Sequence, residues 1–275
     1  MVTTRRDYNE LAVQAAHSVL LELVRILGAY RNDIAVVGGW VPALFFGGEA
    51  EKHVGSTDVD IAINHITVDD LGYKTIRELL IGRGYSEGKQ PFIFFRTVTV
   101  GTIKINVEVD FLAGEYGGTG RSHRTQKVQD LRIRKARGCE LAFEQPNEMT
   151  IEGLLPSGAR DTGSVRVAAI VPFIVMKGMA LHDRMKEKDA WDVYYCVKHF
   201  PGGNERLAED FRVHGRNKLV AEGLIKIAAK FATVDHYGPM AVADFEEITD
   251  PDERAIRQRD AFERVRDLLS RLGYQ

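Results

Sequence analysis

The chain has 275 residues, of which 44% are hydrophobic, so it can bury a core in one large or two smaller domains. Its net charge of −2 excludes a global attraction to nucleic acid or membranes, and a polyanionic partner would have to meet a local basic patch. Cys139 and Cys196 are too few for a disulfide framework and lack the spacing of a metal site. Because there is neither an apolar run of about 18 residues nor a signal-peptide core, we expect a cytoplasmic protein with no membrane partner.

The first half of the chain alternates predicted helices and strands. Apolar residues at helical spacing and β-branched runs give the order helix 7–29, strand 34–37, helix 41–46, strand 58–63, helix 68–82 and strands 92–100 and 102–112. Gly28 ends the first helix, and Gly101 joins the last two strands as an antiparallel hairpin. The pattern predicts an α/β fold with a mixed sheet backed by helices, in a domain over residues 1–150.

The second half is predicted to be mainly helical. Weak strand patterns around 128–170 come first. Helices are expected over 172–199, 204–233 and 251–272. The last of them begins with the helix-start signature Asp250-Pro251. We therefore expect a second, helical domain over residues 151–275.

Two aspartates stand two positions apart in the stretch GSTDVDIAIN. In a strand, residues i and i+2 point to one face, so Asp58 and Asp60 project together while Val59 and Ile61 face the core. Adjacent carboxylates repel each other, and a divalent cation offsets this repulsion. Mg²⁺ is usually bound through carboxylates together with substrate phosphates, so the pattern predicts a magnesium site.

The same alternation occurs in the later stretch INVEVDFL. Asn106, Glu108 and Asp110 share one face of this predicted strand, opposite its apolar residues. If the two strands are neighbours, Asp110 joins Asp58 and Asp60 in one cluster. The alternative interpretation of either stretch alone is an ordinary strand whose acidic residues lie on a solvated face.

These stretches together resemble a known signature. VVGGW followed by GSTDVDIAIN, with a third carboxylate in VEVDFL, is similar to the signature of the nucleotidyltransferase superfamily, which has the fold of DNA polymerase β. The resemblance implies a mixed-sheet α+β fold in which the backbone N–H groups of Gly38 and Gly39 hold nucleotide phosphates. The gap from Gly39 to Asp58 is longer than is usual for this family, which implies an insertion near residues 46–54.

The resemblance also assigns the polar residues of the quoted strands. It implies that Asp58, Asp60 and Asp110 are catalytic and hold one or two Mg²⁺ ions, which organise phosphoryl transfer from a nucleoside triphosphate. Ser56 and Thr57, which directly precede the first aspartate, are expected to contact the nucleotide.

A second motif lies in the expected helical domain. KGMALHDRMKEKDAWDVYY resembles the Lys-x3-Leu-x2-Arg-x3-Lys-Asp pattern of the AbiEii-like nucleotidyltransferase toxins of bacterial toxin-antitoxin and phage-defence systems. The resemblance implies that Lys177 and Asp189 are required for activity. On one continuous helix, a stripe within about 80° holds Lys177, Leu181, Arg184, Lys188 and Asp192. The three cations of this stripe are candidates for binding a triphosphate.

The position of Asp189 leaves two alternatives. On an ideal helix it lies about 120° from Lys177, so either the helix is broken near Asp183 or the two residues have different roles. Whether Asp189 or Asp192 acts in the site is open. The alternative interpretation of the whole stretch is a salt-bridged surface helix.

The resemblance implies a Mg²⁺-dependent nucleotidyltransferase that acts as a toxin, with the helical domain completing the active site. The implied acceptor is a tRNA 3′ end, and the implied partner is a cognate antitoxin. A protein hydroxyl or a small molecule such as an aminoglycoside is the alternative acceptor, and a non-catalytic binding module is a further alternative. The basic run KVQDLRIRKARG, which follows Arg121 and Arg124 and contains Arg132 and Arg134, is a candidate RNA track or, equally well, a solvated strand face.

Overall fold

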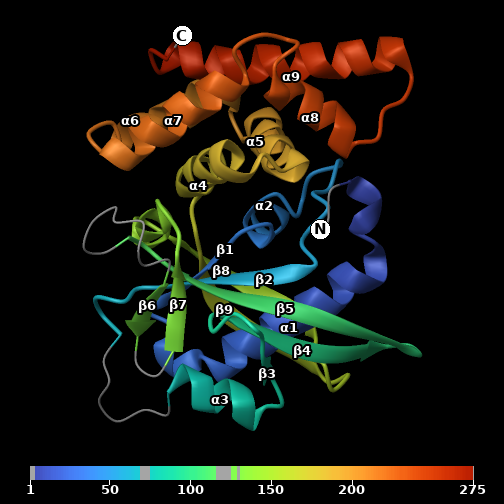
Figure 1. The fold of residues 1–275 in the computed structure, drawn as a ribbon, viewed down its shortest axis with the longest axis vertical. Helices are drawn as coiled ribbons and strands as arrows, with labels where there is room; N and C mark the ends of the chain where they lie inside the picture. Colours follow the sequence, from blue (N-terminus) through green and yellow to red (C-terminus); the bar gives the residue numbers. More distant parts are fainter. Residues whose placement is uncertain (1–3, 69–74, 116–124, 129–130, 275) are drawn as a thin grey trace. The chain divides into compact units, whose positions relative to one another are not determined.

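The computed structural model describes residues 4–68, 75–115, 125–128 and 131–274 (Figure 1). The chain forms two compact units, each of which is described by itself: a sheet unit of residues 9–44 and 54–169, and a helical unit of residues 1–8, 45–53 and 170–275. The boundary expected at residue 150 falls inside a strand, because the sheet unit continues to Ala169. Within the described ranges, no helix is both long and apolar enough to cross a membrane.

Nine strands of the described residues form one mixed sheet, as the alternating pattern predicts. Their bounds are β1 (Ile34–Val37), β2 (Asp58–Ile63), β3 (Ser86–Glu87), β4 (Ile93–Val100), β5 (Ile103–Ala113), β6 (Thr125–Val128), β7 (Leu131–Lys135), β8 (Asn147–Leu154) and β9 (Arg160–Val167). The main path runs β3-β4-β5-β2-β1-β9-β8, and the hairpin β6–β7 joins it where β7 pairs with the end of β5. β2 runs parallel to β5 and antiparallel to β1, so the strand of the paired aspartates is central in the sheet.

Side-chain caps mark the starts of two helices of the sheet unit. The helices of this unit are α1 (Glu10–Ile26), α2 (Trp40–Phe45, of which Phe45 belongs to the helical unit) and α3 (Ile76–Gly82). The Asn9 side chain accepts from the N–H of Ala12 and so caps α1, whose apolar face packs on the sheet (Figure 1). α3 begins at a capping box of Thr75 and Glu78 and covers only the second half of the helix expected over 68–82, of which residues 69–74 lie outside the described residues.

The helical unit contains α4 (Ile170–Arg184), α5 (Glu187–His199), α6 (Gly203–Val213), α7 (Lys218–Lys230), α8 (Tyr237–Phe245) and α9 (Pro251–Arg271). The single helices predicted over 172–199 and 204–233 are wrong, since each is a pair, and α8 was not predicted. Met185, which has a φ of 47°, interrupts the helix between α4 and α5. The Asn217 side chain caps the start of α7. The Asp250-Pro251 start of α9 is confirmed, with Asp250 accepting from the N–H groups of Asp252 and Glu253.

Candidate functional site

The carboxylates of the sheet unit lie on two adjacent strands. β2 and β5 pair in parallel, with Asp60 directly opposite Asp110 and Asp58 opposite Glu108. Val59 and Ile61 are buried while Asp58 and Asp60 are half-buried, so the predicted division of the strand into two faces is confirmed. The condition stated for the cluster, that the two strands are neighbours, is met.

Asp110 is the most deeply buried of these carboxylates, with 5% of its surface exposed. Its Oδ2 accepts a hydrogen bond from Arg134 at 3.0 Å, whereas its Oδ1 is buried and has no hydrogen-bond partner among the described residues. Burial, followed by the negative charge of Asp60, raises the pKa of Asp110 to about 8, although Arg134 opposes the shift. A buried carboxylate oxygen without a partner is costly, and a bound cation or a proton would satisfy it.

The glycine pair lies against the second aspartate. Gly38 has a φ of +67°, and a Cβ at this position would lie 1.9 Å from Oδ2 of Asp60. Only glycine permits this approach of backbone and carboxylate. Trp40 at the start of α2 donates its Nε1–H to the carbonyl of Asp58 at 2.8 Å and so fixes the start of β2. α2 has only six residues, so its helix dipole is small. The feature of this segment is the close approach of the Gly38 backbone to the Asp60 carboxylate.

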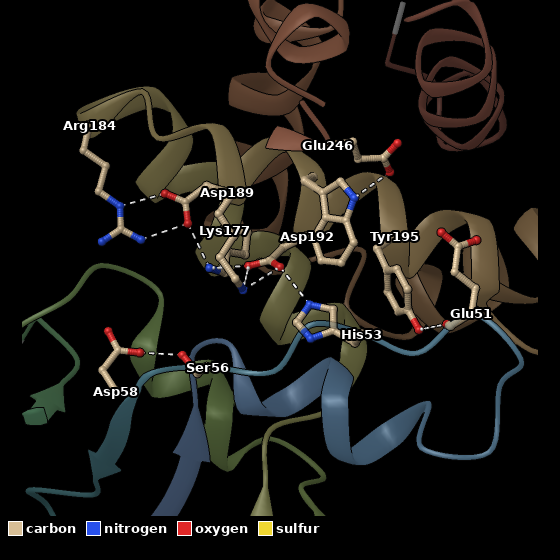
Figure 2. Close-up of polar contacts among 12 residues, drawn as sticks. Glu51, His53, Ser56, Asp58, Lys177, Arg184, Asp189, Asp192, Tyr195 and Glu246 are labelled. Atoms are coloured by element: carbon tan, nitrogen blue, oxygen red, sulfur yellow. Dashed lines mark hydrogen bonds and ion pairs between the residues drawn. The ribbon is translucent and has the colours of Figure 1, made fainter. Parts of the chain in front are cut away.

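Asp58 is placed by the residues before it. Its Oδ1 accepts a hydrogen bond from the Ser56 hydroxyl, and Ser56 itself is buried (Figure 2). As the side chains of the described residues stand, no three His, Cys, Asp or Glu groups form a set that could hold a metal ion. The donor chemistry of Asp60 and Asp110, with one unpaired oxygen, nevertheless fits a hard divalent cation, which prefers carboxylate oxygens.

The residues of the second motif come together in the helical unit. The chain breaks between α4 and α5 at Met185 and Lys186, so the first of the two alternatives for Asp189 is confirmed. The break lets α5 return to α4, and the Lys177 ammonium lies 2.8 Å from Oδ1 of Asp189 and 2.7 Å from Oδ2 of Asp192 (Figure 2). The continuous stripe inferred from the sequence is therefore wrong, yet its charged residues still meet.

Two more cations complete this group. Arg184 donates two hydrogen bonds to Asp189, at 2.7 and 2.8 Å, and Lys188 lies 2.9 Å from Asp192. Lys188 is 3% exposed, so it neutralises Asp192 internally, whereas the side chain of Arg184 is 45% exposed. We call Lys177, Arg184, Lys188, Asp189 and Asp192 the ion cluster.

Opposing effects act on the charges of the ion cluster. Burial favours the neutral form of Asp192, but Lys177 and Lys188 outweigh it and hold the pKa well below its usual range. Burial likewise lowers the pKa of Lys177, but Asp189 and Asp192 together raise it above its usual value. Asp192 and Lys177 therefore both stay charged at neutral pH.

Sequence reasoning missed His53. Its ring is fully buried in the helical unit, and its Nε2 lies 2.9 Å from Oδ1 of Asp192. The signal for it was the expected insertion near residues 46–54, which contains this histidine. Nothing in the sequence paired it with a residue 139 positions away.

The basic run contributes one visible contact to the site. Arg134 on β7 pairs with Asp110 of the sheet unit, which neither the RNA-track nor the solvated-face interpretation anticipated. Arg121, Arg124 and the side chain of Arg132 lie outside the described part of the chain. The predicted functional residues thus form two groups, one in each unit. No protein-family model, no curated protein and no solved structure matches this chain.

Proposed function

We propose that the protein is a Mg²⁺-dependent nucleotidyltransferase that transfers a nucleoside monophosphate from a triphosphate to an acceptor. One observation carries the proposal: Asp60 and Asp110 lie opposite each other on neighbouring parallel strands, and an unpaired, buried Oδ1 of Asp110 remains. Stability alone does not favour such a pair, because like charges repel and the orphaned oxygen is desolvated. A site that binds a cation uses both features.

The carboxylates have distinct roles in this proposal. Asp58, Asp60 and Asp110 would hold the magnesium, which when bound would supply charge stabilisation for the phosphate oxygens. The acceptor oxygen forms a bond to the α-phosphorus, the bond to the β-phosphate oxygen breaks, and pyrophosphate leaves. Asp110, as a ligand of the magnesium, would help to activate the acceptor hydroxyl, whose proton passes to the solvent. Gly38, which has no Cβ, leaves room for the carboxylate of Asp60.

By the resemblance alone, the ion cluster of the helical unit would supply positive charge for the nucleotide. It contains three cations and two carboxylates, Asp189 and Asp192, so one positive charge is in excess. Arg184 is the most exposed of the cations and Lys177 is 8% exposed, which suits them for contact with phosphates better than Lys188. In the proposal, Lys177 neutralises the charge that develops on the phosphates during transfer.

The acceptor that we propose is an RNA, in keeping with the resemblance to AbiEii-like toxins, whose activity is held in check by an antitoxin. The basic run around Arg134 supports an RNA more than a small cationic substrate, because phosphates are bound through local lysines and arginines. Transfer to the 3′ end of a tRNA would stop translation.

The test uses the full-length protein with Mg²⁺, each α-³²P-labelled nucleoside triphosphate in turn, and total bacterial RNA and protein. Asp58→Ala removes one proposed ligand, and Glu87→Ala is the matched control, an exposed carboxylate of the sheet unit that pairs with Arg77. We expect label on a tRNA-sized band that falls at least about 100-fold in Asp58→Ala and persists in Glu87→Ala. Label on a protein band would retain the chemistry and change the acceptor. If no label depends on Asp58, the proposed function is wrong.

A further inference from the structure

We propose that His53 is a positioning residue that holds Asp192, and through it Lys177, in the ion cluster. The inference rests on the proposed function only for what Lys177 does to a nucleotide. How Lys177 is held is a separate matter and is decided by the contacts of the helical unit alone.

The His53 ring contacts a carboxylate and two aromatic rings. Its Nε2 lies 2.9 Å from Oδ1 of Asp192, and its ring centroid lies 5.0 Å from that of Trp191 and 4.9 Å from that of Tyr195 (Figure 2). The side chains of His53 and Asp192 are both 0% exposed. A ring packed between two others in a closed core has few orientations, so the direction of its N–H is fixed.

The imidazole acts as a neutral donor. Asp192 already faces the ammonium groups of Lys177 and Lys188, and a third positive charge in this core would be unfavourable. Burial, followed by the charge of Lys188, lowers the pKa of His53 to about 4, although Asp192 opposes the shift. At neutral pH the ring is therefore uncharged. Since a carboxylate only accepts, the hydrogen-bond geometry requires the tautomer with its proton on Nε2.

The segment that carries His53 packs against α5, the helix that carries Asp192. We call residues 45–53 the strap. The Tyr195 hydroxyl donates to the carbonyl of Glu51 at 2.7 Å (Figure 2). Lys198 pairs with the Glu51 carboxylate at 2.7 Å, and the ring of Phe46 packs edge-on against that of Tyr195, with 5.6 Å between the ring centroids. The strap is therefore bound to α5 by contacts other than that of His53, and His53 reaches Asp192 from a segment outside α5.

The consequence concerns the orientation of Asp192. With His53 in place, Oδ1 is held by His53 and Lys188, and Oδ2 lies 2.7 Å from Lys177 and 3.1 Å from Lys188. Without a donor at His53, only Lys188 holds Oδ1, and the carboxylate can turn about its contacts with Lys188, which lies four residues away on the same helix and reaches both oxygens. Lys177 then loses one of its two anionic partners and its fixed position.

The experiment measures the reactivity of Lys177 directly. Reductive methylation with isotopic formaldehyde, read by peptide mass spectrometry, compares Lys177 with the exposed Lys218 in the same protein. His53→Phe keeps the aromatic packing and removes the donor, and His53→Gln keeps a donor near the position of Nε2. His199→Phe is the matched control, because His199 packs on the same Tyr195 ring at 4.4 Å but pairs with Glu51.

We expect Lys177 to be methylated about tenfold faster in His53→Phe, the effect of losing one hydrogen bond to a charged group. His53→Gln restores protection and His199→Phe keeps it. In the nucleotide-transfer assay, kcat falls by a similar factor in His53→Phe alone, while KM changes little. Unchanged protection of Lys177 in His53→Phe overturns the inference. Altered protection with no transfer activity in any variant, wild type included, upholds it and rejects the proposed function instead.

A measurement on the unaltered protein covers the case in which His53→Phe does not fold. The ¹⁵N NMR signals of a histidine distinguish its two neutral tautomers and its charged form. We expect the His53 ring to carry its proton on Nε2 and to stay neutral at pH 6. A proton on Nδ1 alone, or a charged ring at that pH, overturns the inference.

Discussion

The two groups of charged residues differ in how far their buried carboxylates are neutralised by cations. In the sheet unit, Asp60 faces Asp110 and the buried oxygen of Asp110 lacks a hydrogen-bond partner within the described residues. In the helical unit, Asp189 and Asp192 are each held by two cations at 2.7 to 2.9 Å. The first group is short of positive charge, and the second has it in excess.

This difference separates a repelling pair with an unpaired buried oxygen from carboxylates that are paired with cations of the protein itself. Removing one charge from a saturated buried pair leaves its partner desolvated and unpaired, which is strongly destabilising. Removing one charge from a repelling pair relieves an unfavourable interaction. Substitutions in the two units should therefore change stability in opposite directions.

The largest effect is expected for Asp192→Asn. Lys177 and Lys188 both lose an anionic partner in a core where the Asp192 side chain is 0% exposed, so the free energy of unfolding should fall by about 3–5 kcal/mol. Urea unfolding at pH 7 measures it. Asp183→Asn is the control, since Asp183 is 67% exposed and lies 4.0 Å from its nearest cation, and it should change stability by less than about 0.5 kcal/mol. Equal, small losses would show that the carboxylates of the ion cluster are not each held by two cations.

A smaller effect is expected from the pH dependence that His53 adds. Its pKa of about 4 in the folded protein lies below the unfolded value of 6.5, so the unfolded chain binds more protons between these values. The contribution is therefore complete above pH 6.5 and is lost as the pH falls toward 4, by up to about 3 kcal/mol. The difference between unfolding free energies at pH 7 and pH 4.5 should be larger in the wild type than in His53→Gln. Parallel profiles would mean that the imidazole is not held neutral.

The fold and site residues of the sheet unit were easier to predict than those of the helical unit, because the sequence patterns that indicate them are local. Alternation over a few residues determines which side chains of β2 and β5 share a face, and Gly101 marks the hairpin of β4 and β5. The burial of Asp110 is the part that a two-residue period misses, since the pattern gives the face of a side chain and not its depth.

The ion cluster was only partly predictable. The sequence motif gave the right charged residues and the wrong geometry, because nothing in HDRMKEKD is a conventional helix breaker. The break depends on tertiary contacts instead, among them the hydrogen bond that the Tyr237 hydroxyl donates to the carbonyl of Met185. His53 had no local pattern at all, since its partner is distant in sequence.

The smallest effect, and the sharpest test of the contrast, is expected for Asp60→Asn in the metal-free protein. The folded pKa of Asp110, about 8, lies above its ordinary value of 3.8, so its contribution to stability is complete below that value and is lost as the pH rises through 8. Removing the charge of Asp60 lessens that loss, and at pH 9 the variant should be more stable than the wild type by about 1 kcal/mol, the size of a partly screened charge interaction. Near pH 5, where Asp110 is protonated, the gain should vanish. Added Mg²⁺ should reverse the order, because ligand binding stabilises only the protein that retains the site. A variant that is less stable at every pH, as Asp192→Asn is expected to be, would place Asp60 among the carboxylates that hold the fold together.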